Sequence, residues 1–366
     1  MEKAFASPSR YIQGKGVLKT GVKHIEKLGN NALLLCGNTT WKVVGEAFHQ
    51  ILLDSGLSVT RVAFNGESSM EEVNRVTDIS KAAGVDVVLG LGGGKVIDTA
   101  KAIADSLQVP VAILPTIASS DAPTSALSVI YTEDGTFEQY LFYKKNPELV
   151  LIDTEIISKA PVRMLVSGIA DAFATWVEGR AVLESKQTTM AGGHPTLAAA
   201  AIAQKCEEVL FEHGLQAVEA NQAGIVNDAL EAVVEANTLL SGIGFESCGL
   251  AAAHSIHNGF TALHGPIHEL THGEKVAYGI LTQLFLEKRS EEELNKYIHF
   301  FQALGLPTTL EELKLADASR HDLLQIGQQA TAEGETIHNM PFSVSAAEVA
   351  DALEGVNQYV LSLARK

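Results

Sequence analysis

The sequence is poor in cysteine and has no long apolar run. Its 366 residues include only Cys36, Cys206 and Cys248, which are odd in number and far apart. This usage excludes a disulfide framework and fits a reducing compartment. No apolar stretch reaches the roughly 18 residues of a membrane-spanning helix, and the opening residues, MEKAFASPSR, lack the basic and apolar regions of a secretory leader. We therefore expect no membrane span and a cytoplasmic location.

Basic residues are also scarce. The chain has 27 Lys and Arg against 44 Asp and Glu, which gives a formal net charge of −17. Nucleic acids and anionic membrane surfaces both bind basic surfaces, so neither is expected as a partner. A small phosphate-bearing ligand needs only a local group of donors and is not excluded by the net charge.

The first part of the chain alternates between strand-like and helix-like segments. Such alternation predicts a parallel sheet with helices on both faces. The expected strands are residues 31–36, 58–64, 85–91, 109–116 and 148–153, and the expected helices are residues 42–57, 70–83 and 95–106. Residues 125–131 and 136–142 flank the turn sequence TEDG and are expected to form a hairpin.

From about residue 163 the composition changes to Ala, Leu and Glu in helical spacing, without further strand alternation. A chain of 366 residues is also too long for one ordinary core, so two domains are expected. We predict an α/β nucleotide-binding domain over residues 1–160 and an all-α second domain over residues 161–366.

The stretch VVLGLGGGKVIDTAKAIA, residues 87–104, places four glycines between an expected strand and an expected helix. Gly90, Gly92, Gly93 and Gly94 let a ligand approach the free N–H groups at the start of that helix, where the helix dipole favours negative charge. Lys95 could add a positive charge. The junction predicts a phosphate or pyrophosphate site. The alternative is a tight turn packed closely between strand and helix.

Two common phosphate-binding motifs do not describe this stretch. A Walker loop has Ser or Thr after its Gly-Lys pair, where this sequence has Val96. The dinucleotide fingerprint G-x-G-x-x-G, counted from Gly90, would end on Lys95 in place of glycine. The prediction therefore rests on the helix terminus and not on a motif.

Histidines gather in one later segment. Five of the twelve fall within AAAHSIHNGFTALHGPIHELTHGEKVAYG, at positions 254, 257, 264, 268 and 272. Imidazole suits Zn, Fe, Cu and Ni, and a carboxylate usually completes such a site. Taken singly, each histidine is more often a surface or hydrogen-bonded residue, but the cluster favours a metal site.

A carboxylate for that site is available in SGIADAFATW. There Asp171 stands among small and apolar residues, where a charged group is costly unless it is paired or bound to a metal. We predict that Asp171 and some of these histidines share a site.

Five motifs follow one another along the chain: GGGKVIDTAKA, PTIASSDAPTSALSVIY, SGIADAFATW, GFESCGLAAAHSIHNGFTAL and HGEKVAYG. Together they resemble the glycerol dehydrogenase branch of the iron-containing, metal-dependent alcohol dehydrogenase family. The resemblance extends over essentially the whole chain. It implies a dehydroquinate synthase-like fold, with a nucleotide-binding domain, a helical domain and an active site in the cleft between them.

The resemblance implies Asp171, His254 and His272 as metal ligands. Family members that use iron have a further histidine four residues after the aspartate, where this sequence has Thr175. Three protein ligands and an open fourth position describe a catalytic zinc site. We therefore expect Zn²⁺, with Fe²⁺ as the alternative.

A nicotinamide dinucleotide cofactor is implied as well. Its pyrophosphate would lie along Gly92, Gly93, Gly94 and Lys95, in a loop that Asp98 steadies. The implied adenine-side contacts are Thr116 and Ser119, and the implied nicotinamide-side contacts are Ser125, Leu127 and Tyr131.

One departure concerns the adenosine ribose. Relatives that use NAD have an acid after the first expected strand, but here the segment reads CGNTTWK and Gly37 follows Cys36. The missing carboxylate removes the repulsion of a 2′-phosphate, which Thr39, Thr40 or Lys42 could hold. We expect NAD, because the other motifs resemble the NAD-using branch. NADP stays open as the alternative.

The implied reaction is zinc-dependent oxidation of glycerol at C2 to dihydroxyacetone, with hydride passing to the nicotinamide. Asp121 corresponds to the residue that binds substrate hydroxyls, and Phe245 is similar to the aromatic wall of the pocket. His257 is either a route for the proton or a structural histidine. The implied assembly is a homo-oligomer, with an octamer as one possibility.

Other readings stay open beside this one. The first is a dehydrogenase or reductase of another vicinal diol or of a 2-hydroxy acid. Family relatives with phosphorylated substrates need a basic pocket, and only Lys275 lies near these motifs. A non-catalytic cofactor-binding protein is disfavoured by the intact trio Asp171, His254 and His272.

Overall fold

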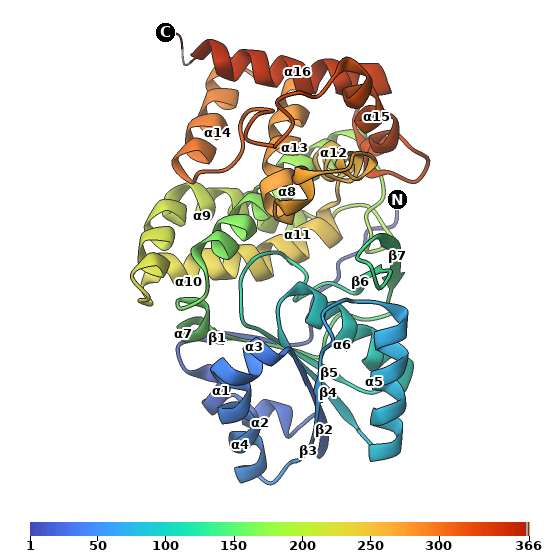
Figure 1. The fold of residues 1–366 in the computed structure, drawn as a ribbon, viewed down its shortest axis with the longest axis vertical. Coiled ribbons are helices and arrows are strands. Elements are labelled where there is room, and N and C mark those ends of the chain that lie inside the picture. The colour runs from blue at the N-terminus through green and yellow to red at the C-terminus, as the bar shows by residue number, and fades with distance from the viewer. Residues whose placement is uncertain (364, 366) are drawn as a thin grey trace. The chain divides into compact units, whose positions relative to one another are not determined.

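The structure, a computed structural model, describes residues 1–363 and 365 (Figure 1). The chain divides into two compact units. The first, here called the sheet unit, comprises Ala6–Leu165 and Gln216–Gly242. The second, the helical unit, comprises Met1–Phe5, Val166–Leu215 and Ile243–Lys366.

Within the described residues of the sheet unit, six strands form one parallel sheet in the order β1-β8-β5-β4-β2-β3. The strands are β1 (Tyr11–Gly14), β2 (Asn31–Cys36), β3 (Ser58–Ala63), β4 (Val87–Gly92), β5 (Val111–Pro115) and β8 (Leu149–Asp153). The chain leaves β2 toward β3 and then returns to β4 on the other side of β2. Ligands of open parallel sheets bind at the carboxyl ends of strands beside such a reversal.

Helices cover both faces of this sheet, as the strand–helix alternation predicts (Figure 1). One face carries α1 (Val17–Thr20), α2 (Val22–Ile25) and α4 (Glu46–Asp54), with the short helix α3 (Asn38–Thr40) and a π-helical turn (Trp41–Gly45) before α4. The other face carries α5 (Met70–Ala83) and α6 (Gly94–Leu107). The predicted α/β architecture is confirmed.

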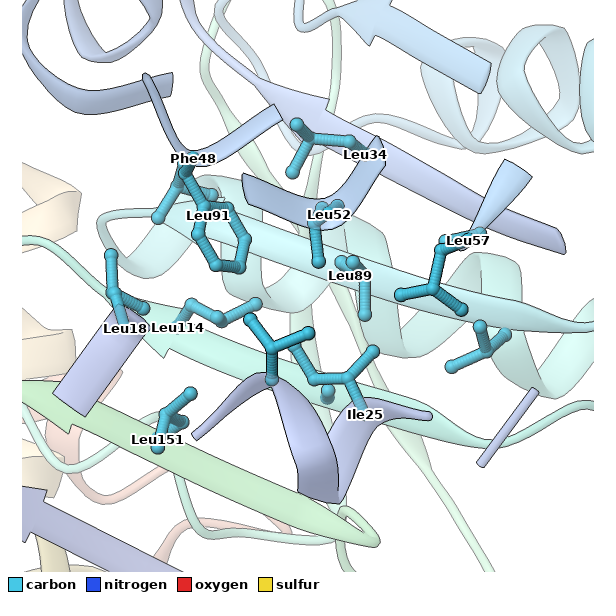
Figure 2. Packing of buried hydrophobic residues seen from close by; sticks show 14 of the residues in the cluster. Leu18, Ile25, Leu34, Phe48, Leu52, Leu57, Leu89, Leu91, Leu114 and Leu151 are labelled. Atoms are coloured by element: carbon cyan, nitrogen blue, oxygen red, sulfur yellow. The ribbon is translucent and has the colours of Figure 1, made fainter. Parts of the chain in front are cut away.

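The core on the α4 face is built from alternate residues of the strands. Figure 2 shows Leu34, Leu89 and Leu114 of the central strands facing Phe48 and Leu52 of α4. All five side chains are almost completely buried. Burying a leucine or phenylalanine side chain contributes roughly 1.5–3 kcal/mol, so this face fixes the sheet on which the carboxyl-end loops are mounted.

The strand that the sequence did not reveal is β1. It has four residues, all of them only half-buried, so it lacks the continuous apolar run of the central strands. Its pairing with β8 makes β4 the fourth strand of the chain and not the third. The predicted ranges 31–36 and 70–83 coincide with β2 and α5.

The hairpin predicted around TEDG is present. Strands β6 (Leu127–Tyr131) and β7 (Phe137–Phe142) pair antiparallel, and the Thr132 N–H donates to the Thr136 carbonyl at 2.8 Å across the turn. Strand β6 packs on α6, the helix that follows the glycine stretch.

The helical unit contains most of α8 (Val162–Ser185), α9 (Leu197–Gln222) and α11 (Ser241–Cys248), together with α12 (Ala252–Gly259), α13 (His272–Leu286), α14 (Glu291–Ala303), α15 (Arg320–Ala330) and α16 (Ala346–Leu363). Short 3₁₀ turns lie at Phe260–Ala262, Pro266–Glu269 and Thr336–Asn339. Among the residues that the structure describes, no helix is long and apolar enough to cross a membrane.

The two units differ from the expected ranges 1–160 and 161–366 in three segments: Met1–Phe5 belongs to the helical unit, and residues 161–165 and 216–242 belong to the sheet unit. Residues 216–242, with α10 (Asp228–Glu235) and a π-helical turn (Ala236–Leu240), belong to the sheet unit together with α7 (Thr154–Ile157). Hydrogen bonds hold residues 216–242 to the sheet unit: the Glu231 carboxylate accepts from Gln13 of β1 and from Thr154 of α7. Helical periodicity alone carries no trace of such long-range pairs.

Candidate metal centre and cofactor loop

Asp171, His254 and His272 come together in the helical unit. They lie on α8, α12 and α13, and one ligand atom from each lies within 4.8 Å of the others. The Asp171 Oδ1 atom is 3.3 Å from His254 Nε2 and 3.0 Å from His272 Nε2. The Asp171 carboxylate is 1% exposed, so it faces the two imidazoles and not bulk water.

Local sequence sets the position of His272. Thr271 caps the start of α13 in a capping box with Glu274, so His272 is the first residue of the helix. The next residue must be small, because a Cβ at Gly273 would lie 1.8 Å from the Ser167 carbonyl oxygen on α8. This close approach of two helix backbones brings His272 against Asp171.

Glu178 orients His254 and was not foreseen from the sequence. Its carboxylate accepts from His254 Nδ1 at 2.5 Å and from the backbone N–H groups of His254 and Ala251. The N–H groups of Ala252 and Ala253 donate to Gln283 Oε1 of α13, each at 2.9 Å. Side chains from α8 and α13 therefore satisfy the first amides of α12.

A signal for Glu178 exists in the sequence. It stands seven residues after Asp171, which is two helical turns, so both acids lie on one face of α8. Glu178 is completely buried. Two acids at this spacing within an apolar helix mark a ligand and the group that supports it.

A hydrogen-bond chain fixes the tautomer of His272. The Asn258 amide donates to the Glu335 carboxylate at 3.0 and 3.3 Å, so its Oδ1 must accept from His257 Nδ1, 3.2 Å away. The His257 Nε2 atom then accepts from His272 Nδ1 at 3.1 Å. This leaves His272 Nε2 with a lone pair that faces Asp171.

The donor set fits a divalent cation. Since His254 donates its Nδ1–H to Glu178, both histidines direct an Nε2 lone pair toward the Asp171 carboxylate. Only a cation or added protons can hold these three groups together. The electrostatics agree. Burial would raise the pKa of Asp171, but His272 and His254 lower it well below its usual range. Burial lowers the pKa of His254, but Glu178 and Asp171 together raise it well above normal.

Replacing Glu178 by glutamine is expected to lower the affinity for Zn²⁺ about 10- to 100-fold. A glutamine Nε2 cannot accept from His254 Nδ1, so either that ring or the amides of α12 lose an acceptor. Competition with a coloured chelator measures the affinity. The matched control is Glu311→Gln, at an exposed position of the same unit. Equal affinities in the two variants would show that Glu178 does not support the site.

The remaining histidines of the segment lie elsewhere. His268 Nε2 is 2.6 Å from the Leu263 carbonyl oxygen, which accounts for its position in the loop before α13. His264 is exposed. Neither belongs to the cluster of ligand atoms that Asp171, His254 and His272 form.

The glycine stretch forms the turn from β4 into α6. The N-cap residue is Gly93, and no side chain caps this helix within the described residues. Two of the glycines are required by packing, because a Cβ at Gly90 or Gly92 would lie 2.6 or 2.8 Å from the Cβ atom of Ala100 or Val96; a Cβ at Gly93 would meet the end of the Ile117 side chain at 2.8 Å. A Cβ at Gly94 would meet nothing closer than the Ser120 hydroxyl at 3.9 Å. The turn is thus tightly packed inside and uncapped outside, which fits a phosphate ligand.

Lys95 and Asp98 flank this turn. The Lys95 ammonium pairs with Glu67 at 2.5 Å and lies 5.5 Å from the Tyr131 ring centre. Asp98 accepts from the Val129 N–H of β6 at 3.2 Å. Burial raises the pKa of the Asp98 carboxyl to about 6, against the opposing charge of Lys101. This contact joins α6 to β6; the role of Asp98 in steadying a cofactor-binding loop stays a prediction.

Other predicted cofactor residues lie near the carboxyl ends of the strands. Gly37 follows β2, and a Cβ added there would have nothing within 4 Å. The Thr116 N–H donates to the Gly92 carbonyl at 3.0 Å, which ties the end of β5 to that of β4. Ser119 follows in the same loop. Ser125 and Leu127 lie at the start of β6, where both accept hydrogen bonds from Lys101.

The two predicted substrate residues have different settings. Asp121, in the sheet unit, accepts from the Ser241 hydroxyl at 3.1 Å through Oδ2. Phe245 is buried in α11, within the helical unit. Their roles in binding substrate stay predictions.

Known proteins similar to this chain identify its family. The family described as iron-containing alcohol dehydrogenase matches residues 8–154. The chain is 48% identical to glycerol dehydrogenase of Citrobacter freundii and 47% identical to glycolaldehyde reductase of Halobacterium salinarum, over 96% of both chains in each case. The crystal structure of glycerol dehydrogenase from Schizosaccharomyces pombe matches with a TM-score of 0.95 at 43% identity, covering 99% of this chain and 92% of that one.

These matches confirm the resemblance carried by the five motifs, and they agree in fold with the parallel sheet and the helical unit. Relatives at this identity over nearly the full length establish common descent. The chain is an oxidoreductase acting on CH–OH groups and belongs to the iron-containing alcohol dehydrogenase family, in the group that includes the glycerol dehydrogenases.

Proposed function

We propose that this oxidoreductase converts glycerol to dihydroxyacetone with Zn²⁺ and NAD. The observation that carries the proposal is the buried carboxylate of Asp171 held against two imidazole lone pairs, in a chain 48% identical to a glycerol dehydrogenase. A phosphorylated substrate is not favoured, because it would need a basic pocket: the groups that contact Asp171 and His254 are imidazoles and carboxylates, and Lys275 acts on His257 only through its charge.

The residues that would hold the metal ion are Asp171, His254 and His272, and the uncapped turn at Gly93–Lys95 would hold the cofactor phosphates. When bound, the ion supplies Lewis acidity at the alcohol oxygen and the nicotinamide supplies the hydride acceptor. The protein keeps both imidazoles in the tautomer that presents Nε2, through Glu178 on one side and His257 on the other. A proton held at Nε2, which the raised pKa of His254 favours, would leave as the cation binds.

Substrate orientation is assigned to Asp121 and Phe245. The Asp121 carboxylate would accept a hydrogen bond from a terminal hydroxyl of the polyol. The hydrogen bond that Ser241 donates to Asp121 holds this carboxylate in place. Phe245 would supply an apolar wall. Positioning of this kind lowers the entropic cost of bringing the reacting carbon to the cofactor.

The assignment of His257 to proton transfer stays a prediction. Its ring connects His272 with Asn258, and Asn258 leads on to Glu335. An imidazole accepts a proton on one nitrogen and donates from the other, so His257 is the group of this series that could pass a proton, whereas the Asn258 amide only holds its ring; a purely structural role for His257 stays the alternative.

A second candidate reaction is reduction of a 2-hydroxyaldehyde such as glycolaldehyde. The observation that favours it is the 47% identity to a glycolaldehyde reductase over the same 96% of the chain. Both substrates have a hydroxyl on the carbon next to the reacting carbon, so both reactions need the same polar groups in the site. They differ in the substrate and in the direction of hydride transfer. Oxidation of another vicinal diol or of a 2-hydroxy acid belongs to the same comparison.

The test measures turnover in both directions after removal and return of metal. Purified protein is treated with a chelator and assayed with and without Zn²⁺ or Fe²⁺, using glycerol, propane-1,2-diol, lactate and glycerol 1-phosphate for oxidation and glycolaldehyde and dihydroxyacetone for reduction. Zinc-dependent oxidation of glycerol with the highest kcat/KM supports the proposal. Faster turnover of glycolaldehyde favours the second candidate, and no metal-dependent turnover of any substrate overturns both.

The cofactor preference can be moved at one position. Because a side chain at Gly37 meets no neighbour, Gly37→Asp is expected to raise the ratio of kcat/KM for NAD over NADP about tenfold or more. The new carboxylate would accept from the ribose hydroxyls and repel a 2′-phosphate. Gly37→Asn, of similar size without the charge, is the control and should change the ratio much less. An unchanged ratio in the aspartate variant would remove Gly37 from the ribose site.

We also propose a homo-oligomer and a cytoplasmic location for the protein. The size of the particle in solution, measured by light scattering after gel filtration, decides the first. The small and odd number of cysteines supports the second.

A further inference from the structure

A buried lysine connects the glycine-rich helix to the loop that follows β5. Lys101 lies on α6, two turns after Gly94, and is 3% exposed. Lysine is among the residues least often fully buried, because its ammonium group loses much hydration energy. Its position therefore requires strong partners, and the structure shows where they come from.

The ammonium group of Lys101 donates to three acceptors within one short segment. These are the Ala122 carbonyl, the Ser125 hydroxyl at 3.1 Å and the Leu127 carbonyl at 2.9 Å. An ammonium group has three protons, so three convergent acceptors match its full donor capacity. Two of the three are backbone groups, which fixes the path of residues 122–127 and not merely one side chain.

Asp98, one turn before Lys101 on α6, completes the connection. Its carboxylate lies 3.8 Å from the Lys101 ammonium and accepts from the Val129 N–H, while the Ser128 hydroxyl donates to the Asp98 carbonyl. One face of α6 is thus bonded to the loop and to the first half of β6. The same helix begins at the uncapped turn assigned to the cofactor phosphates.

We infer that Lys101 is a positioning residue, which holds the segment 121–127 at a fixed distance from the phosphate-binding turn so that the nicotinamide half of the cofactor meets a preformed surface. The inference rests on the proposed function, since Asp121, Ser125 and Leu127 take their roles from it. Lys101 itself touches neither cofactor nor substrate in this assignment; it acts through the backbone that it bonds.

This arrangement has a consequence for binding. A dinucleotide would bridge the turn at Gly93–Lys95 and the segment 121–127, whereas ADP-ribose lacks the nicotinamide ring and would depend on the turn and the adenine-side residues. Releasing the segment should weaken the first ligand and spare the second. A lysine that merely supports the core would affect both ligands equally, or only the stability of the fold.

The experiment compares two ligands on one variant. Lys101→Met keeps the length of the side chain and removes its donors. We expect the dissociation constant for NADH, followed by its fluorescence, to rise about tenfold or more, with that for ADP-ribose changed by less than about twofold. If the wild-type chain prefers NADPH, that cofactor and its 2′-phosphorylated fragment are used. Lys81→Met, at an exposed position of α5, is the control and should change neither constant.

A second variant covers the case in which the first does not fold. Lys101→Arg retains the positive charge beside Asp98, but a planar guanidinium cannot aim at three acceptors that converge on one point. It should show the same selective loss for NADH to a smaller degree, with faster hydrogen exchange in residues 121–127 than in wild type.

Two results would overturn the inference alone: unchanged NADH binding in a folded Lys101 variant, or equal losses for NADH and ADP-ribose. Failure of the wild-type chain to bind a nicotinamide cofactor would instead overturn the proposed function and this inference with it.

Discussion

Replacing Asp171 by asparagine is expected to lower kcat/KM for the alcohol by about 10³-fold or more, which corresponds to about 4 kcal/mol of transition-state stabilisation. The substitution keeps the shape of the side chain and removes the negative charge that faces the two imidazoles at 3.0 and 3.3 Å. The affinity for Zn²⁺ should fall with the activity. Steady-state kinetics and chelator competition on the same preparation measure both quantities.

The control for this prediction is Asp317→Asn, an exposed aspartate in the same unit, which should behave as wild type. Asp171→Asn also removes a buried charge, so its unfolding temperature is measured alongside. A folded Asp171→Asn variant with nearly normal, metal-dependent turnover would end the assignment of this residue as a ligand.

Adding a single methyl group at Gly273 is expected to have the next largest effect. In Gly273→Ala the new Cβ would lie 1.8 Å from the Ser167 carbonyl oxygen and 2.6 Å from its carbonyl carbon, and a backbone group cannot rotate away. The start of α13 must therefore move from α8, which carries His272 away from Asp171. A displacement of about 1 Å at a site of this kind costs about 10²-fold, so we expect that loss in kcat/KM together with weaker Zn²⁺ binding.

Chelator competition measures the Zn²⁺ affinity of Gly273→Ala, which should fall if the start of α13 has moved from α8. For metal affinity the control is Gly37→Ala, where the added Cβ meets no atom within 4 Å. Wild-type affinity in Gly273→Ala would mean that α13 can shift without moving His272, and the account of the close helix approach would be wrong.

Some features of the site and the fold could be predicted from residue types and their order in the sequence. Asp171 stands out because an acid in an apolar helix needs a partner, and the histidines stand out by density. The alternation of buried strands and helices predicted the sheet, because β4 and, after Asn31, β2 are apolar and fully buried. Choosing His254 and His272 among five histidines required the resemblance to a family, since spacing left several sets open.

What the sequence could not predict depends on contacts between distant residues. Lys101 looks like any solvated lysine on an amphipathic helix, because its acceptors are backbone carbonyls more than twenty positions later. Glu335 and Asn258 lie 77 positions apart, and only the fold joins them. The strand β1 has four half-buried residues and is recognised as a strand by its pairing with β8.

The first amides of α12 have a further consequence. They donate to the side chains of Glu178 and Gln283, and these hydrogen bonds involve no metal ligand atom, so we expect the loop and helix that present His254 to keep them when no cation is bound. We therefore expect the loss of a bound cation to be a reversible exchange and not an unfolding event. The identity of the resident ion is then decided by the ion concentrations to which the protein is exposed and by the general affinity order of divalent metals, with no help from an ion-dependent fold.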